Sequence, residues 1–231
     1  MATSATEEKE ASGSSPDRVV DWVQQGLYTG RYVPGQKLIE ADLIATLGIS
    51  RGPVREGLKR LHGKGVVELT PHRGAQIRAF THIEADHLLI VLEALTSLMA
   101  RLAAEAVREG ADAKQLAEVH EWISRFRRGD VSDISFVGKR EHFYETLMTI
   151  GGNLELPLIM PIAQLHLLRL QSFPYLDPKN RQNILDEYLR ITDAVLRGDG
   201  KAAEDAGRAH VRAARKRLAA LPREAFPLVK A

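Results

Sequence analysis

The sequence predicts a mainly α-helical protein, with an N-terminal domain of three helices and a β-hairpin followed by an antiparallel bundle of six helices. Three observations predict this fold class. Apolar residues recur at helical spacing over most of the chain, strand-like runs occur only before Phe80, and glycine-containing breaks separate the later helical segments. With 231 residues and 44% hydrophobic content, the chain is long enough for two modest domains with real cores.

The composition excludes several kinds of protein. The chain contains no cysteine, which rules out disulfides, thiolate zinc sites and a cysteine nucleophile. It also contains no run of 18 apolar residues, and its polar, acidic residues 1–16 lack the apolar segment of a secretory signal. We therefore expect a cytoplasmic protein in which residues 1–16 form a disordered tail.

The net charge of +2 is distributed very unevenly along the chain. Residues 17–80 carry ten Lys and Arg against six Asp and Glu, whereas residues 81–231 carry 21 of each. The basic excess thus belongs to the small N-terminal domain. A basic patch on a compact module is typical of proteins that bind the phosphate backbone of nucleic acids, although a solvated basic face is the plainer alternative.

Three helices are expected in the N-terminal domain, which we place at residues 17–80. The apolar positions of the first helix follow one face and stop at Gly30, and the second helix stops at Gly48. Ser50 is a good N-cap for the third helix. The expected spans are residues 17–30, 40–47 and 50–64.

The third helix has the chemistry of a helix that enters a DNA groove. Arg51, Arg55 and Lys59 recur every four residues and line one outward stripe. The two arginines can reach guanine O6 and N7 or a phosphate. The hydroxyl of Ser50 can hold a phosphate, and Gly52 allows the DNA to approach closely.

A short basic hairpin is expected after this helix. Strand-like residues at 66–69 and 75–77 flank the tip Pro71-His72-Arg73-Gly74. Arg73 at a glycine-containing tip is positioned to enter the adjacent minor groove. Three helices followed by a two-stranded hairpin form a winged helix-turn-helix.

Residues 81–221 are expected to form the helical domain, with a loose C-terminal tail at 222–231. Short breaks that contain glycine or proline favour an antiparallel bundle. One winged domain makes few base contacts, so useful specificity needs two copies on the duplex, and the neutral bundle is the candidate for both the dimer contact and a ligand cavity. The expected helices are 82–109, 112–128, 131–150, 153–172, 178–197 and 200–220.

These residues resemble the GntR superfamily of bacterial transcription regulators, FadR subfamily, whose helical effector domain is called FCD. The resemblance covers about residues 18–220, and a bundle that starts directly after the wing is similar to the VanR-type arrangement. The motif consists of Gly30, Tyr32 to Glu40, Leu47 to Arg51, Pro53 to Glu56, Leu61, Gly65 to Val67, Arg73 and Gly74.

The resemblance implies which residues contact double-stranded DNA. In the helix they are Ser50, Arg51, Gly52 and Arg55, and in the wing they are His72, Arg73 and Gly74. One position departs from the family, because Gly57 stands where most members have alanine. We expect this glycine to soften the third helix by up to ~1 kcal/mol without removing a DNA contact.

The helical domain departs further from the family. Many members hold a divalent metal with an Asp and three His, and the corresponding positions here are Arg140, Tyr144, Tyr188 and His210. Only one ligand remains, so we expect no metal cofactor; an irregular site around His142, His166 or His210 is the alternative. The same four residues are predicted to bind a small-molecule effector directly, because Arg grips carboxylates or phosphates and Tyr hydroxyls orient them. Ordinary buried polar residues would show the same pattern.

The sequence therefore predicts a homodimeric, ligand-responsive transcription regulator that recognises a palindrome, with repression as the expected mode. One alternative is effector-independent DNA binding in which the bundle only dimerises. A second is an enzyme with His120, His142, His166 or His210 as a base and Glu141 or Glu145 as an acid, but no nucleophile elbow, phosphate loop or paired metal motif organises them. We expect no enzyme activity.

Overall fold

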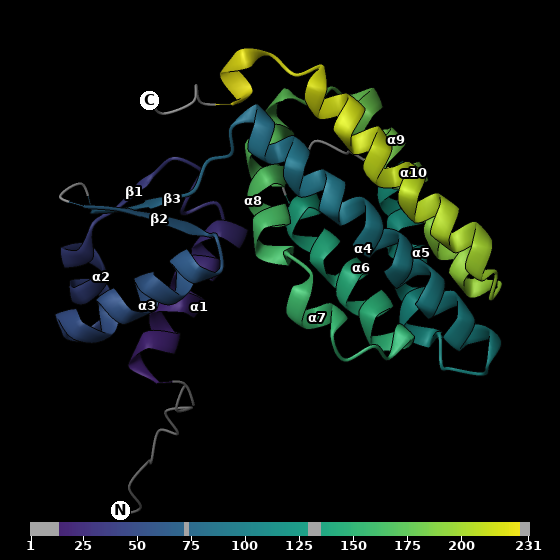
Figure 1. The fold of residues 1–231 in the computed structure, drawn as a ribbon, viewed down its shortest axis with the longest axis horizontal. Coiled ribbons are helices and arrows are strands. Elements are labelled where there is room, and N and C mark those ends of the chain that lie inside the picture. The colour runs from purple at the N-terminus through teal and green to yellow at the C-terminus, as the bar shows by residue number, and fades with distance from the viewer. Residues whose placement is uncertain (1–13, 72–73, 129–134, 227–231) are drawn as a thin grey trace, which may run out of the picture. The chain divides into compact units, whose positions relative to one another are not determined.

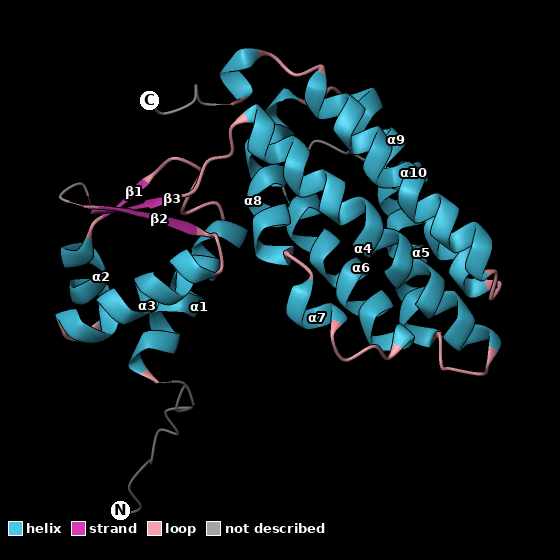
Figure 2. Cartoon of the chain, viewed as in Figure 1, coloured by secondary structure: helices cyan, strands magenta, loops and turns pink. Residues whose placement is uncertain are grey.

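The computed structural model describes residues 14–71, 74–128 and 135–226, with the backbone alone at 135–139. The chain divides into two compact units between Arg78 and Ala79. Figure 1 follows the helices and strands along the chain, and Figure 2 shows that strands occur in the N-terminal unit while the C-terminal unit is built from helices. The predicted fold class is confirmed in both units.

The N-terminal unit contains three helices packed on a small sheet. The helices are α1 (Ser15–Tyr28), α2 (Glu40–Leu47) and α3 (Arg51–Gly63), and the strands are β1 (Lys37–Leu38), β2 (Val67–Thr70) and β3 (Gly74–Ile77). The sheet is antiparallel in the order β1-β3-β2. Apolar residues of α1, α3 and the sheet, among them Val23, Leu58, Leu61 and Ile77, are almost completely buried between these elements.

Two predictions for this unit were wrong in detail. The sheet has a third strand, which pairs Lys37 with Gln76 and Leu38 with Ala75. Two residues are too few to show an alternating pattern, so this strand left no signal in the sequence. The predicted tail also ends earlier, because the side chain of Asp17 accepts hydrogen bonds from the backbone and hydroxyl of Ser14, and this capping box starts α1 at Ser15.

The C-terminal unit is an antiparallel helical bundle around α4. This helix packs against α6, α9 and α10, and α5 packs against α6 and α9. Gly207 allows α10 to approach closely, because a Cβ atom there would lie 3.0 Å from the carbonyl oxygen of Thr96 on α4. The helices are α4 (His82–Arg108), α5 (Lys114–Arg128), α6 (Ser135–Gly151), α7 (Leu156–Ile159), α8 (Ile162–Ser172), α9 (Pro178–Leu196) and α10 (Gly200–Ala219).

The bundle contains one helix more than predicted. The expected helix at 153–172 is two helices, α7 and α8, separated at Met160 and Pro161. Proline disfavours the helical conformation of the residue before it, and Met160 is extended, with φ −67° and ψ 117°. This break lets α8 change direction before it reaches the interior of the bundle.

The segment predicted as a loose tail is partly folded. Arg223–Ala225 form a 3-10 turn, and Phe226 is buried with its ring 5.2 Å from that of His82 in an edge-to-face contact. The side-chain amide of Gln171 on α8 donates to the carbonyl of Ala225. The apolar contact and the hydrogen bond together hold the segment on the bundle.

By length and composition alone, α4 could span a membrane, because an 18-residue window within it has a mean hydropathy of 1.5. In the structure 44% of that window is buried, and the helix lies between α6, α9 and α10. Its remaining apolar residues include Ile83, Ile90 and Val91, which are about half exposed.

Candidate functional site

The cationic stripe of α3 lies on the surface of the N-terminal unit. The side chains of Arg51 and Arg55 are 69% and 55% exposed, and Lys59 is exposed as well. Both arginines donate from Nε to the carboxylate of Glu40 at the start of α2, at 3.3 and 3.1 Å. Such exposed ion pairs are weak, so DNA phosphates or guanine bases can compete for both guanidinium groups.

The start of α3 is open to a phosphate. Ser50 occupies the N-cap position in an extended conformation, and its hydroxyl makes no cap hydrogen bond. A Cβ atom at Gly52 would meet no other heavy atom within 4 Å, so the chain is accessible from outside there. Free N–H groups and the partial positive charge at a helix start favour anions.

Gly57 has a packing role that the sequence did not indicate. It faces α1, and a Cβ atom at this position would lie 2.6 Å from the Cβ of Val19 and 2.8 Å from the carbonyl oxygen of Pro16. Alanine would therefore push α1 away from α3. The expectation that Gly57 merely softens α3 overlooked this contact.

The wing is described only in part. Gly74 begins β3 with a φ of +83°, a conformation that glycine adopts without strain. His72 and Arg73 lie outside the described residues, so the DNA contacts predicted for them remain predictions.

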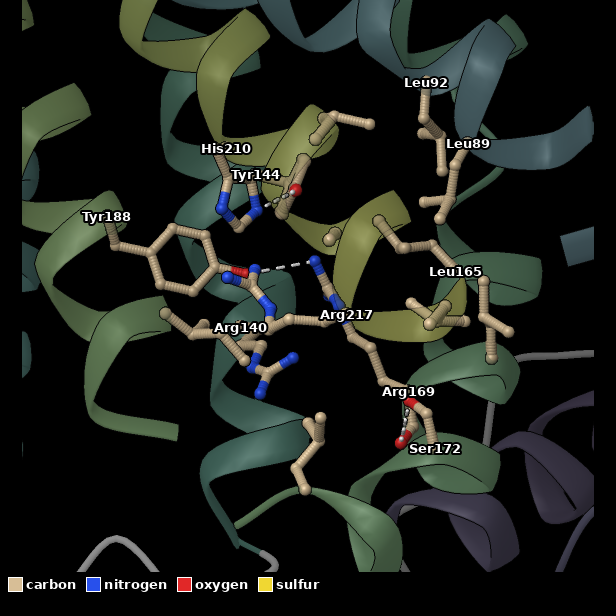
Figure 3. Close-up of a pocket in the computed structure, with 16 residues that line it drawn as sticks. Leu89, Leu92, Arg140, Tyr144, Leu165, Arg169, Ser172, Tyr188, His210 and Arg217 are labelled. Atoms are coloured by element: carbon tan, nitrogen blue, oxygen red, sulfur yellow. Dashed lines mark hydrogen bonds between the residues drawn. The ribbon is translucent and has the colours of Figure 1, made fainter. Parts of the chain in front are cut away.

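A cavity lies inside the C-terminal unit, between α4, α6, α8, α9 and α10. The volume in which the centre of a water molecule can lie is about 50 Å³. Figure 3 shows Arg140, Tyr144, Tyr188 and His210 gathered on one side and Leu89, Leu92 and Leu165 on the other. The structure therefore brings together the four residues predicted to bind an effector, although it does not test whether they do so.

Three further charged residues at this site were missed by the sequence reasoning. They are Arg169, Arg217 and Glu187. Figure 3 shows the side chains of both arginines converging with that of Arg140, and Glu187 is buried next to Tyr188 on α9. A charged residue inside the apolar run of α8 was the one available signal, and it pointed to Arg169.

Glu187 joins two of the cavity residues. Its carboxylate accepts two hydrogen bonds from Arg217, of 2.6 and 2.8 Å, and lies 2.8 Å from Nδ1 of His210. Burial alone would raise the pKa of Glu187, but the hydrogen bonds and charges of these partners lower it to about 2. Burial lowers the pKa of His210, although Glu187 opposes the shift. His210 is therefore neutral at neutral pH, while Glu187 and Arg217 form a buried ion pair.

Two aromatic side chains position Arg169. Arg169 donates to the hydroxyl of Tyr188 at 3.2 Å, and its guanidinium lies 4.9 Å from the ring centroid of Tyr144. Burial lowers the pKa of Arg140 to about 10, and the nearby charges of Arg169 and Arg217 contribute to the decrease. The cavity lining therefore places three arginines beside the hydroxyl groups of Tyr144 and Tyr188.

The residues at the four family metal positions do not fit a divalent cation. Arg140 brings a positive charge, and Nδ1 of His210 already faces Glu187. Burial raises the pKa of Tyr144, which keeps its phenol protonated. Over residues 14–71, 74–128 and 135–226, no group of three or more metal-ligating His, Asp or Glu side chains comes together. His142 lines a different pocket, beside Trp122.

Comparison with known proteins agrees with this description. The model of the FCD domain matches residues 87–213, and that of the bacterial regulatory proteins of the gntR family matches residues 16–77. Together the two matches identify a DNA-binding transcription regulator. The chain belongs to the gntR family and carries an FCD domain.

Similar proteins are found among regulators of several bacteria. An HTH-type transcriptional regulator in an unstable DNA locus of Streptomyces ambofaciens is 30% identical over 193 residues, which cover 83% of this chain and 79% of that protein. The galactonate operon transcriptional repressor of Escherichia coli K12 is 26% identical and is covered to 96%, with 87% of this chain aligned. The solved structure of E. coli McbR/YncC has the same fold, with a TM-score of 0.74, 18% identity, and coverage of 90% of this chain and 98% of that one.

Proposed function

We propose that the protein is a homodimeric repressor that binds a palindromic operator and responds to a small organic acid or similar metabolite held in its helical domain. One observation carries the proposal: the chain combines an exposed cationic stripe on α3 with a buried, arginine-lined cavity in a separate unit. The stripe suits DNA and the cavity suits a small anion, so the two units divide recognition and control between them.

In the proposed complex α3 enters the major groove. Arg51 and Arg55 leave Glu40 and bind guanine edges or phosphates, while Ser50 and the start of the helix hold a phosphate. Gly52 lets the backbone approach the DNA. The wing residues His72, Arg73 and Gly74 contact the neighbouring minor groove.

The proposed dimer forms through the helical domain. Ile83, Ile90 and Val91 lie on α4 and are about half exposed, at 58%, 48% and 54%. Large apolar side chains that share one helix and face solvent are characteristic of association surfaces. Two copies joined in this way present two α3 helices to the two halves of a palindrome.

The proposed control is a shift between orientations of the two winged domains. A ligand in the cavity favours the bundle conformation that it fits best, and it can change DNA affinity only as far as it distinguishes the two states. Repression is proposed because relatives such as the galactonate operon regulator are named repressors.

The test is an operator shift assay with variants of α3. Arg51→Ala and Arg55→Ala should each weaken operator binding at least tenfold and lower its salt dependence, because each removes a base or phosphate contact. The matched control is Arg60→Ala, on the same helix but paired with Asp17 and Glu56 outside the stripe. The control should bind nearly as wild type, and light scattering should find a dimer in every variant.

If both stripe variants bind the operator with near-normal affinity, α3 is not part of the DNA interface. A regulator whose DNA affinity responds to no small acid in an EDTA-containing buffer would instead be the effector-independent type, with the bundle serving only to dimerise. A monomer at working concentration would contradict the proposed assembly.

A further inference from the structure

The chain is anchored on both sides of the boundary between its two units. The backbone N–H of Arg78 donates to the carbonyl of Val66 within the N-terminal unit, at 2.9 Å. Two residues later Phe80 is completely buried in the helical domain, with its N–H and its carbonyl both hydrogen-bonded there. Ala79 alone separates these two anchored positions. The direction in which the chain leaves the helical domain therefore depends on how Phe80 is held.

Gln171 on α8 holds the backbone of Phe80 with both ends of its side-chain amide. Its Oε1 accepts from the N–H of Phe80 and its Nε2 donates to the carbonyl of Phe80, each at 2.8 Å. Nε2 also donates to the carbonyl of Ala225 at 2.9 Å. An amide offers one acceptor and two donor hydrogens, so all three functions of the side chain are used. Glutamate has the same shape and could accept from Phe80, but it could make neither of the two donated bonds.

The same helix forms one wall of the cavity. Leu165, Leu168, Arg169 and Ser172 line the cavity, and their spacing of three and four residues places them on one face of α8. Gln171 lies on the flank of this face, about 60° around the helix from Leu168 and about 4.5 Å farther along its axis. Less than one helical turn thus separates the cavity wall from the residue that holds the linker.

We propose that α8 transmits the state of the cavity to the winged domain, and that Gln171 is the positioning residue of this coupling. A ligand that displaces the wall at Leu168 and Arg169 moves Gln171, and Gln171 moves Phe80, from which the chain continues into the N-terminal unit. The orientation of the winged domain then follows the occupancy of the cavity. The inference rests on the proposed function, because it names how the proposed effector site acts on DNA affinity.

The hydrogen bonds make Phe80 follow Gln171 rather than separate from it. Phe80 is buried, and breaking its bonds to Gln171 would leave a backbone N–H and a carbonyl away from water. A packed helix moves as a unit more readily than such bonds break, so a small displacement of α8 passes to the linker. The bond to Ala225 adds the C-terminal segment to the same group.

The experiment uses substitutions in the cavity wall in place of a ligand. Leu168→Ala shortens a side chain that is 1% exposed, so α8 relaxes toward the vacated space. The milder Leu168→Val is the second variant, for the case that Leu168→Ala does not fold. An operator is first selected from random DNA with the full chain. Fluorescence anisotropy then measures binding to the complete palindrome and to a single half-site, with the melting temperature recorded for each variant.

Gln171→Glu should weaken binding to the complete palindrome about fivefold or more, because the linker loses two of its bonds to α8. Leu168→Ala should change this affinity by a similar factor. Both variants should bind the half-site within about twofold of wild type, since α3 itself is unaltered. In the double variant the two effects should not multiply, because they act through one connection. A purely structural role of Gln171 would not separate the two DNAs in this way.

Two control variants distinguish α8 from the rest of the bundle. Ile184→Ala enlarges the same cavity from α9 and should leave both affinities unchanged. Tyr175→Phe removes a hydrogen bond from the Tyr175 hydroxyl to the carbonyl of Glu224, which holds the C-terminal segment without involving Phe80. This variant should also bind both DNAs as wild type.

Three results would overturn the inference. Effects that multiply in the double variant would mean that the cavity wall and Gln171 act separately. Folded Leu168 variants with wild-type affinity for the palindrome would mean that the cavity face of α8 does not act on DNA binding. An equal effect of Ile184→Ala would mean a general loosening of the bundle. If instead Arg51→Ala and Arg55→Ala leave operator binding unchanged, the proposed DNA-binding function itself is wrong, so the two failures are distinguishable.

Discussion

Glutamine in place of Glu187 should destabilise the helical domain strongly. The substitution keeps the size of the side chain but removes the negative charge that faces Arg217 and His210. Arg217 is only 11% exposed at its side chain, so its charge would remain buried without a counter-charge. Removing one partner of a buried ion pair costs about 3–5 kcal/mol.

The pKa of Glu187 gives an independent magnitude. A decrease from the ordinary 4.5 to about 2 corresponds to about 3 kcal/mol. Because the pKa is lower in the folded state, this stability is fully present above pH 4.5 and is lost as the pH falls toward 2. The gap between wild type and Glu187→Gln should therefore be about 2 kcal/mol smaller at pH 3 than at pH 7.

Urea unfolding at pH 7 and at acid pH measures both effects. The control is Glu121→Gln, because Glu121 pairs with Arg125 and the two side chains are 62% and 70% exposed. Such a surface pair contributes about 1 kcal/mol or less. The double variant Glu187→Gln with Arg217→Met should recover much of the loss by removing the uncompensated charge. A Glu187→Gln variant within about 1 kcal/mol of wild type at pH 7 would refute the reasoning, since the pair would then be no stronger than a surface pair.

Two further substitutions test contacts elsewhere in the protein. Gly57→Ala should cost about 1–3 kcal/mol in a thermal unfolding assay, because the added Cβ would overlap α1. The control is Gly52→Ala, which should be neutral or stabilising because a Cβ there meets no heavy atom within 4 Å. A Gly57→Ala variant more stable than wild type would contradict the close approach of α1 and α3. Gln171→Ala removes three hydrogen bonds to the backbone of Phe80 and Ala225 and should cost about 2–4 kcal/mol. The backbone amide of Phe80 should then exchange its hydrogen faster. Unchanged exchange at Phe80 would show that other contacts hold Phe80 in place.

The sequence was informative where local rules decide the structure. Gly48 adopts a φ of +63° and stops α2, and α3 begins directly after Ser50, as expected from capping chemistry. The errors arose where a contact with a residue far away in the sequence determines the local structure. β1 exists because β3 pairs with it, and Phe226 is ordered because His82 lies beside it. Neither contact leaves a periodic signal in the short segment that it stabilises.

At the cavity, the positions of the residues could be predicted from the sequence, but their hydrogen-bond partners could not. Arg140, Tyr144, Tyr188 and His210 could be placed together from the family resemblance, because each occupies an aligned helical position. The hydrogen-bond partners could not be read in this way, since Arg217 reaches Glu187 from another helix. Helical periodicity indicates which face of a helix is buried, but it does not identify the side chain on the opposing helix.

His210 shows how hydrogen-bond partners change the interpretation of a residue. Its position alone identifies it as the one family metal ligand that remains, which would favour a residual metal site. In the structure Nδ1 faces Glu187, while Nε2 lies 3.5 Å from the hydroxyl of Tyr144. The ring therefore links a buried carboxylate to a cavity hydroxyl, and its protonation would add a fourth positive charge beside the three arginines. Because burial keeps the pKa of His210 below its ordinary value, the histidine links Tyr144 and Glu187 as a neutral group.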